Sequence, residues 1–378
     1  MHKAKKLLID SLEHADIRIN GTRPWDVIVH NDELFDRILR DGTLGAGEAY
    51  MEGWWDCDAL DVLFYKAIGG NMERELSHSL PVFFVSLRQK FFNMQSIRHA
   101  VDVAKRHYNI SNELFAAMLG PTMNYSCGYW RHASTLEEAQ MAKMELICRK
   151  LDLKPGMKVL DIGCGWGGLC RYMHDHYQAD VTGISVASEQ IRYAKEHDPE
   201  QTIHWLCDDY RALAGSYDRI VSVGMFEHVG RKNYATYMQK VRSLLKKDGL
   251  FLLHTIGANY QKSGADPWIN KYIFPNGMLP APVSLSKAFS GLFVLEDWHN
   301  FGADYDRTLM AWYERFEKGL KEGGFTCHEE VRRMYRYYLL SCAGAFRARD
   351  IQLWQLVLSP HGVAGGYRGV RNLDPARN

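Results

Sequence analysis

The middle of the chain alternates short apolar runs with stretches of helical periodicity. Helical patterns begin at Leu169 and near Ser188, after the first two runs. Strands that alternate with helices form a parallel sheet from βαβ units. We therefore predict a doubly wound α/β sheet, and the ligands of such sheets lie beyond the carboxyl ends of the strands. The apolar runs that we interpret as its strands are residues 158–162, 180–185, 203–207, 217–223 and 250–256.

Two further strand-like runs, residues 294–302 and 351–359, flank helical patterns at 306–321 and 329–346. They extend the predicted sheet to seven strands. The segment 266–282 is rich in proline, asparagine and glycine and is too long for a simple connector. It is therefore a candidate lid or substrate-binding segment.

Residues 1–100 lack this alternation. They contain helical stretches, a glycine-rich turn at residues 41–47 and a cluster of aromatic side chains around Trp54. We assign them to a smaller, mainly helical N-terminal domain with a candidate role in docking on lipid. Residues 101–360 then form the catalytic domain, and 361–378, which lack apolar periodicity, form a flexible tail.

Composition narrows the class of protein. The 378 residues are 46% hydrophobic and 24% charged, which is typical of a globular chain with two domains. Lysine and arginine total 46 against 45 acidic residues, so no net field favours nucleic acid, and we expect no nucleic-acid partner. No apolar run approaches the roughly 18 residues of a membrane-spanning helix, and charges interrupt the first residues. We expect a cytoplasmic protein.

The cysteines and histidines do not form a metal-binding pattern. Eight cysteines lie far apart without a CxxC pair, as expected of reduced thiols in a cytoplasm. Only His174 and His176 lie close together among the 16 histidines, and such a pair is usually solvated. We predict no metal site.

The sequence VLDIGCGWGG places Gly163, Gly165 and Gly167 where the first strand turns into a helix. Side chains there would keep the backbone away from a ligand, and the amides of a helix N-terminus point at whatever binds. The pattern differs from the dinucleotide fingerprint and from a P-loop, which disfavours phosphate. Asp161 can accept hydrogen bonds from loop amides or a bound cation. A turn that merely packs helix on strand is the alternative.

LDIGCGWGG (160–168) resembles motif I of the class I S-adenosylmethionine-dependent methyltransferases. The region 104–359 resembles the cyclopropane-fatty-acyl-phospholipid synthase family, and LGAGEAYMEGWWDCD (44–58) resembles the N-terminal domain of its bacterial members. The resemblance implies a Rossmann-like methyltransferase sheet and S-adenosylmethionine as co-substrate. Its further segments are YSCGYW (125–130), VGMFEHVG (223–230), LLHTIG (252–257), DPWINKYIFPNG (266–277), EDWHNFGADYDRTL (296–309) and GAFRARDIQLWQ (344–355).

The resemblance also implies a set of cofactor-binding residues. Two glycines of motif I contact the methionine moiety, and a Tyr-Ser pair covers it from the other side. Neutral side chains at and after the second strand reach the ribose hydroxyls. A pair after the third strand matches the adenine-contacting segment, although its acidic residue could be part of a solvated turn. With Asp161, these residues are Gly163, Gly165, Tyr125, Ser126, Ser185, Gln190, Asp209 and Tyr210.

Cyclopropanation makes two chemical demands. An alkene is a poor nucleophile and a sulfonium methyl a strong electrophile, so methyl transfer to the double bond creates a carbocation. Aromatic faces can stabilise it by roughly 0.5–2 kcal/mol each, and a base must then remove a proton from the new methyl group to close the ring. The candidate aromatic residues, for each of which core packing is the alternative, are Trp130, Tyr272, Phe274, Tyr305 and Trp312.

The resemblance implies that the base is a bound bicarbonate ion. Glu227 would either accept a hydrogen bond from the bicarbonate hydroxyl or hold His254 in the right tautomer. A covalent role for Cys127 is disfavoured, because an alkene needs no nucleophilic activation. Cys342 is a further candidate, with packing as its alternative. The positions that match the family's bicarbonate site are Cys127, Glu227, His254, Ile256 through its backbone, and Tyr305.

The implied substrate, the acyl chain of an unsaturated phospholipid, lies in a bilayer, so the enzyme must dock on the inner face of the membrane. Residues 82–108 interleave basic side chains with phenylalanines, which suits an anionic interface, and a solvated helix face is the alternative. Two other functions stay open: methyl or methylene transfer to an acyl chain without ring closure, and lipid binding without catalysis. A homodimer also stays open.

Overall fold

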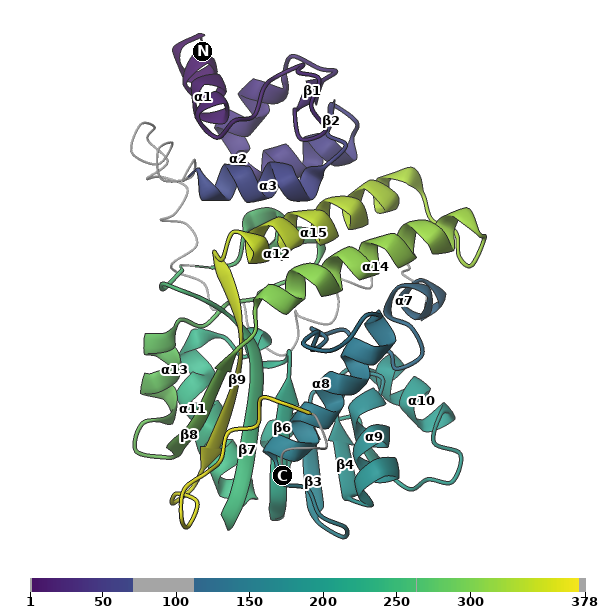
Figure 1. Ribbon diagram of the computed structural model, residues 1–378, viewed down its shortest axis with the longest axis vertical. Helices are drawn as coiled ribbons and strands as arrows, with labels where there is room; N and C mark the ends of the chain where they lie inside the picture. The colour runs from purple at the N-terminus through teal and green to yellow at the C-terminus, as the bar shows by residue number, and fades with distance from the viewer. Residues whose placement is uncertain (1, 71–111, 263, 374–378) are drawn as a thin grey trace. The chain divides into compact units, whose positions relative to one another are not determined.

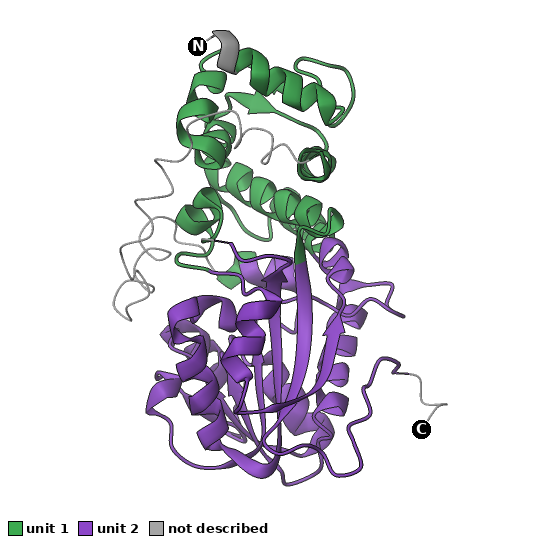
Figure 2. Cartoon of the chain, turned by 90° about the vertical axis from the view of Figure 1, so that its left-hand side faces the viewer, with its two compact units in different colours: residues 1–114, 264–277, 309–351 green, residues 115–263, 278–308, 352–378 purple. Residues whose placement is uncertain are grey.

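The computed structural model describes residues 2–70, 112–262 and 264–373, which fall into two compact units (Figure 2). Unit 1 comprises residues 1–114, 264–277 and 309–351, and unit 2 comprises residues 115–263, 278–308 and 352–378. The boundary predicted at residue 100 lies outside the described residues. Among the described residues, no helix is both long and apolar enough to cross a membrane.

Unit 2 is built on a seven-stranded sheet with the order β5-β4-β3-β6-β7-β9-β8 (Figure 1). Strand β3 pairs in parallel with β4 and β6, β4 with β5, and β6 with β7, whereas β8 and β9 are antiparallel. The prediction of a doubly wound seven-stranded sheet is confirmed. The strands are β3 (Lys158–Ile162), β4 (Asp180–Ile184), β5 (His204–Leu206), β6 (Tyr217–Val223), β7 (Leu245–Ala258), β8 (Val294–Asn300) and β9 (Ile351–Ser359), of which β9 begins with Ile351 in unit 1.

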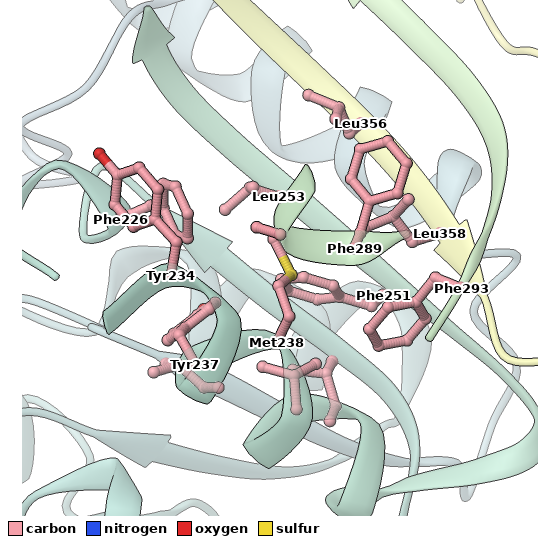
Figure 3. Close-up of a cluster of buried hydrophobic side chains, with 14 of the residues drawn as sticks. Phe226, Tyr234, Tyr237, Met238, Phe251, Leu253, Phe289, Phe293, Leu356 and Leu358 are labelled. Carbon is pink, nitrogen blue, oxygen red and sulfur yellow. The ribbon is translucent and has the colours of Figure 1, made fainter. Parts of the chain in front are cut away.

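Helices cover both faces of this sheet (Figure 1). On one face pack α8 (Leu136–Lys150), α9 (Gly168–Tyr177) and α10 (Ser188–Glu196). On the other pack α11 (Tyr234–Leu244) and α13 (Pro282–Phe289). Figure 3 shows the core on this second side, where aromatic side chains of α11 and α13 meet apolar residues of β7 and β9.

Strand order reverses between β3 and β6, because the chain runs outward from β3 to β5 before it returns to β6. A doubly wound sheet opens a crevice at the carboxyl ends of its strands where this reversal occurs. The segments that follow β3, β6 and β7 are therefore the ones the fold brings together.

Unit 1 is mainly helical, as predicted. It contains α1 (His2–His14), α2 (Leu34–Met51), α3 (Leu60–Gly69), α12 (Pro267–Tyr272), α15 (Glu329–Arg347) and a two-stranded sheet of β1 (Ile28–Val29) and β2 (Trp55–Asp56). Two other helices contain residues of both units: α7 (Asn112–Leu119) and α14 (Ala303–Lys321).

The predicted glycine-rich turn at residues 41–47 was wrong, because these residues lie within α2. Only Gly42 departs from helical geometry, with φ 62°, and it kinks the helix. Gly47 is needed for packing, since a Cβ there would lie 2.3 Å from the ring of Trp268. Trp268 is fully buried and lies 4.5 Å, centroid to centroid, from Tyr337.

The segment predicted as a lid, residues 266–282, forms α12 in its first half. Asp266 caps this helix by accepting hydrogen bonds from the amides of Trp268 and Ile269 at 2.9 and 3.1 Å. Proline at the first helical position suits the start of a helix. Residues 266–277 belong to unit 1 and residues 278–282 to unit 2.

The predicted tail begins at residue 361, and its described part reaches residue 373. Arg371 forms an ion pair with Asp297 on β8, with a hydrogen bond of 2.7 Å from Nη1. The hydroxyl of Tyr367 donates to the carbonyl of Lys150 at 2.9 Å. These contacts attach the tail to the sheet and to α8.

Candidate active site

The turn between β3 and α9 carries the three glycines of motif I in left-handed conformations, with φ 90° at Gly163, 55° at Gly165 and 82° at Gly167. A Cβ at Gly163 would meet the side chain of Met225 at 2.8 Å, so this glycine serves internal packing. At Gly165 no atom of the described residues, apart from the two chain neighbours, lies within 4 Å of the Cβ position. The turn therefore presents bare backbone to open space at Gly165, next to the N-terminus of α9.

Asp161 lies on β3 just before this turn and is buried. Its Oδ2 accepts a hydrogen bond from Cys170 Sγ at 3.4 Å, and its Oδ1 has no partner among the described residues. Burial raises the pKa of Asp161 to about 7. A buried acceptor without a partner is costly, so it suits a ligand that brings a donor or positive charge.

The segment that contains the predicted pair Tyr125 and Ser126 is connected to the motif I turn through Phe115. The ring of Phe115 on α7 lies 5.6 Å from that of Tyr125 and 5.1 Å from that of Trp166 in the motif I turn, centroid to centroid. The same aromatic contacts thus connect the Tyr-Ser segment to the glycine-rich turn. Ser126 is buried.

The residues predicted for the ribose hydroxyls meet directly. The hydroxyl of Ser185, after β4, donates to Gln190 Oε1 on α10 at 3.3 Å. Ser185 Oγ also accepts from the amide of Ala187 at 3.2 Å, which helps to turn the chain into the helix. Both side chains are neutral groups that can donate hydrogen bonds to a diol and accept them from it.

Asp209 and Tyr210 follow β5. Asp209 accepts hydrogen bonds from the backbone and guanidinium of Arg211, of which the shortest is 2.6 Å, and these lower its pKa. It also caps the short helix that begins at Tyr210. The Tyr210 ring packs edge-on against Tyr237, with centroids 5.2 Å apart. Asp209 is therefore a paired residue rather than part of a purely solvated turn.

Two of the predicted bicarbonate ligands, Glu227 after β6 and Ile256 in β7, contact each other, and a third, His254, lies on the same strand as Ile256. The amide of Ile256 donates to Glu227 Oε1 at 2.7 Å, whereas Glu227 Oε2 is buried without a partner among the described residues. His254 lies two residues before Ile256, so their side chains share a face of β7. Burial raises the pKa of Glu227 to about 7, because its charged form is poorly solvated there.

The partner that orients His254 is Gln355 on β9, a residue that the sequence did not indicate. Gln355 Nε2 lies 3.2 Å from His254 Nδ1, and burial lowers the pKa of the imidazole well below its usual value. With the amide donating to Nδ1, the neutral ring carries its proton on Nε2, which is buried and unpartnered in the described structure. Of the two roles predicted for Glu227, holding the tautomer of His254 falls to Gln355 instead.

Cys127 is completely buried, and its Sγ donates to the carbonyl of Gly128 at 3.1 Å. Burial raises the pKa of the thiol well above its usual value, so it stays protonated and is a poor nucleophile. Thr308 on α14 lies 3.7 Å from Cys127 Sγ. Tyr305 lies three residues earlier on the same helix and therefore on the same side, which brings it towards Cys127.

The aromatic candidates divide between the units. Trp130 in unit 2 is held by its own contacts: its Nε1 donates to Thr308 Oγ1 at 2.8 Å, and the Arg307 guanidinium lies 4.5 Å from its ring centroid. Four other candidates belong to unit 1: Tyr272, Phe274, Trp312 and Cys342.

Sequence reasoning also missed Gln140 and Lys143 on α8. Gln140 Nε2 donates to the carbonyl of Ser126 at 2.8 Å, and Lys143 Nζ to its hydroxyl at 2.9 Å. Both side chains are fully buried. Their signal was polar residues within the apolar stripe of a helix, where a polar group needs a partner.

A seven-stranded doubly wound sheet, a glycine-rich turn after its first strand and a buried carboxylate before that turn together define an S-adenosylmethionine-dependent methyltransferase. The family model described as mycolic acid cyclopropane synthetase matches residues 95–356. The chain belongs to this family of cyclopropane synthases.

The relatives extend the match over nearly the whole chain. The cyclopropane-fatty-acyl-phospholipid synthase of Escherichia coli K12 is 52% identical over 360 residues, covering 95% of this chain and 94% of the relative. Among solved structures, the cyclopropane synthase MmaA2 from Mycobacterium tuberculosis has a TM-score of 0.63 at 33% identity, covering 69% of this chain and 98% of that one. The mycolic acid cyclopropane synthase CmaA1 complexed with SAH and CTAB has a TM-score of 0.62 at 32% identity, with coverages of 69% and 98%.

Proposed function

We propose that this enzyme transfers the methyl carbon of S-adenosylmethionine to the cis double bond of unsaturated phospholipid acyl chains and closes a cyclopropane ring, with bicarbonate as the base. The observation that carries the proposal is a pair of buried atoms near the carboxyl ends of β6 and β7, Glu227 Oε2 and His254 Nε2, neither of which has a partner in the described part of the chain. The 52% identity to a cyclopropane-fatty-acyl-phospholipid synthase over 95% of the chain supports the substrate class.

The motif I residues fit S-adenosylmethionine, which supplies an electrophilic methyl group. Gly165 allows close approach of a ligand to the backbone, and Asp161 Oδ1, which no described residue contacts by a hydrogen bond, suits the ammonium group of the cofactor. Ser185 and Gln190 can share hydrogen bonds with a ribose diol. Tyr125 and Ser126 cover the methionine moiety in this proposal.

The groups around His254 fit a small anion that would supply a weak base. Neutral His254 offers the proton on Nε2 as a hydrogen-bond donor to such an anion. Because the pKa of Glu227 is about 7, its carboxyl is partly neutral near physiological pH and repels an anion less than an ordinary glutamate would. Its Oε2 can accept a hydrogen bond from the hydroxyl of bicarbonate. Tyr305 completes the site in this proposal.

A weak base has a specific advantage in this reaction. A strongly basic side chain next to a sulfonium methyl would itself be methylated. All the groups assigned to the base site avoid this risk: His254 is neutral with its Nδ1 occupied by Gln355, and the Cys127 thiol is protonated. These residues can therefore hold a base without competing for the methyl group.

We further infer that the enzyme acts in the cytoplasm, docked on the inner face of the membrane, because its substrate lies in a bilayer. The docking segment expected at residues 82–108 lies outside the described residues. A homodimer remains compatible with this proposal. Anionic headgroups would attract the basic residues of the segment.

Product analysis tests the proposal. The enzyme is incubated with unsaturated phospholipid vesicles and S-adenosylmethionine carrying a deuterated methyl group, and the acyl chains are analysed by mass spectrometry and proton NMR. Ring closure removes one deuterium from the transferred group and produces cyclopropane signals. An exocyclic methylene or a branched methyl group in place of the ring would identify the alternative, transfer without ring closure, and would refute the proposed ring formation.

A further inference from the structure

Lys143 is a buried lysine that the predicted site residues leave without a role. It lies on α8 with 1% of its surface exposed, and its Nζ donates to Ser126 Oγ at 2.9 Å. Burying an ammonium group is costly, and burial lowers the pKa of Lys143 to about 7. The nearby Asp161 and Cys127 act in the opposite direction and raise the pKa. A costly buried charge next to the cofactor residues calls for a functional explanation.

The direction of this hydrogen bond determines what Ser126 can do. An ammonium group only donates, so the Ser126 oxygen accepts from Lys143 and its own hydrogen points elsewhere. Gln140, three residues earlier on the same face of α8, holds the backbone carbonyl of Ser126 at 2.8 Å. Helix α8 therefore holds Ser126 at two points and leaves its hydroxyl as a donor.

A buried acid lies in the same region. Asp161 is buried, and its Oδ1 has no partner within the described part of the chain. Lys143 and Asp161 thus supply a buried amine and a buried carboxyl group, each with a pKa of about 7. The amino-acid end of S-adenosylmethionine carries an ammonium, which suits the Asp161 carboxyl, and a carboxylate, which suits the hydroxyl that Lys143 holds.

We propose that Lys143 is a positioning residue that directs the Ser126 hydroxyl towards the carboxylate of S-adenosylmethionine. This inference rests on the proposed function in one respect, the placement of the methionine moiety beside Ser126. A lysine that only anchored the Tyr-Ser segment would affect every ligand of the site equally. A lysine that acts on the carboxylate affects only ligands that carry one.

Calorimetry with two ligands separates these roles. S-adenosylhomocysteine contains the amino-acid end, whereas 5′-methylthioadenosine lacks it. We expect Lys143→Met to weaken S-adenosylhomocysteine about 10- to 100-fold, the range for a lost hydrogen bond to a charged group. The affinity for 5′-methylthioadenosine should change less than about twofold, because this ligand has no carboxylate for the Ser126 hydroxyl to bind.

Two further variants strengthen the test. Ser126→Ala should reproduce the selective loss even if Lys143→Met fails to fold, and Lys143→Met should add little to it in the double variant. Lys150→Met is the matched control, because Lys150 is also a buried lysine of α8 but pairs with Asp297, at 3.4 Å. We expect Lys150→Met to preserve the ratio of the two affinities.

Equal weakening of both ligands by Lys143→Met would overturn the proposal, as would unchanged binding of S-adenosylhomocysteine. A full effect of Lys143→Met in the Ser126→Ala background would also overturn it, because the lysine would then not act through the serine. The binding assay contains neither lipid nor bicarbonate. Its outcome is therefore distinguishable from a failure of ring closure, which only the products reveal.

Discussion

The open space at Gly165 makes a quantitative prediction about cofactor binding. Valine at this position would have to adopt φ 55°, and among the described residues no atom beyond its chain neighbours lies within 4 Å of the Cβ position. The left-handed conformation costs roughly 1–2 kcal/mol for a residue with a side chain. Because the space is open, the substitution adds no clash within the protein, and any further penalty must come from the ligand.

That further penalty can be worked out in order of magnitude. Added methyl groups in a close-packed contact cost about 1–3 kcal/mol, and about 1.4 kcal/mol corresponds to a tenfold change in affinity. We therefore expect Gly165→Val to weaken binding of S-adenosylhomocysteine about 5- to 140-fold.

Gly156 provides the control, because it precedes β3 at the opposite end of that strand. Its φ is 77°, and it too has no atom within 4 Å of the Cβ position. Gly156→Val should lose the same roughly 1–2 kcal/mol of stability in chemical denaturation and bind S-adenosylhomocysteine as the parent does. Parental affinity in folded Gly165→Val, measured by calorimetry, would refute the assignment of this turn to the cofactor.

Three further predictions concern the base site, its pH dependence and the membrane. Turnover should fall far more than affinity for S-adenosylhomocysteine in each of three variants: His254→Ala, Tyr305→Phe and Gln355→Leu. For Gln355→Leu, which removes one hydrogen bond, turnover should fall about 2- to 10-fold. An equal loss of affinity for S-adenosylhomocysteine would contradict this. Burial raises the pKa of Glu227 from its ordinary value of 4.5 to about 7 in the folded protein. The folded protein therefore loses stability as the pH rises from about 4.5 to about 7, and this loss persists at higher pH. Glu227→Gln should therefore gain stability relative to the parent between pH 5 and pH 8, by at most about 3 kcal/mol in urea unfolding, and a difference independent of pH would refute this. Binding to anionic vesicles should weaken as the salt concentration rises. At roughly 1 kcal/mol per basic residue, changing Arg88, Lys90 and Arg98 to glutamate should weaken this binding about 100-fold. Undiminished co-sedimentation of that triple variant would exclude residues 82–108 as the docking segment.

The sheet was predictable because buried parallel strands appear in the sequence as apolar runs. Strands β3, β6 and β9 begin and end where the pattern places them. Strand β7 begins at Leu245, five residues before the predicted start, because the residues after Leu245 are Lys-Lys-Asp-Gly and interrupt the apolar signal. The glycines at residues 41–47 suggested a turn where the chain forms α2. Gly47 is instead needed for packing against the ring of Trp268, which is more than 200 residues away in sequence and so gives no local signal.

The candidate site was predictable where a local motif or a resemblance marked it. The turn at Gly165 and the pairing of Ser185 with Gln190 follow from residues close in sequence. The roles of Lys143 and Gln355 could not be derived in this way. Each depends on a tertiary contact, between α8 and the Tyr-Ser segment in one case and between β9 and β7 in the other, and a single polar residue in a buried element does not name its partner.

The most direct test of the proposed chemistry is the rate at which cyclopropane rings form in unsaturated phospholipid vesicles as bicarbonate is removed and then restored. Reactions in rigorously carbonate-free buffer should slow strongly and recover with added bicarbonate, while calorimetry shows unchanged binding of S-adenosylhomocysteine. His254→Ala should respond weakly to bicarbonate, because the anion loses a donor at its site. Full ring formation without carbonate, in the parent enzyme, would contradict the assignment of Glu227 and His254 to a bicarbonate base.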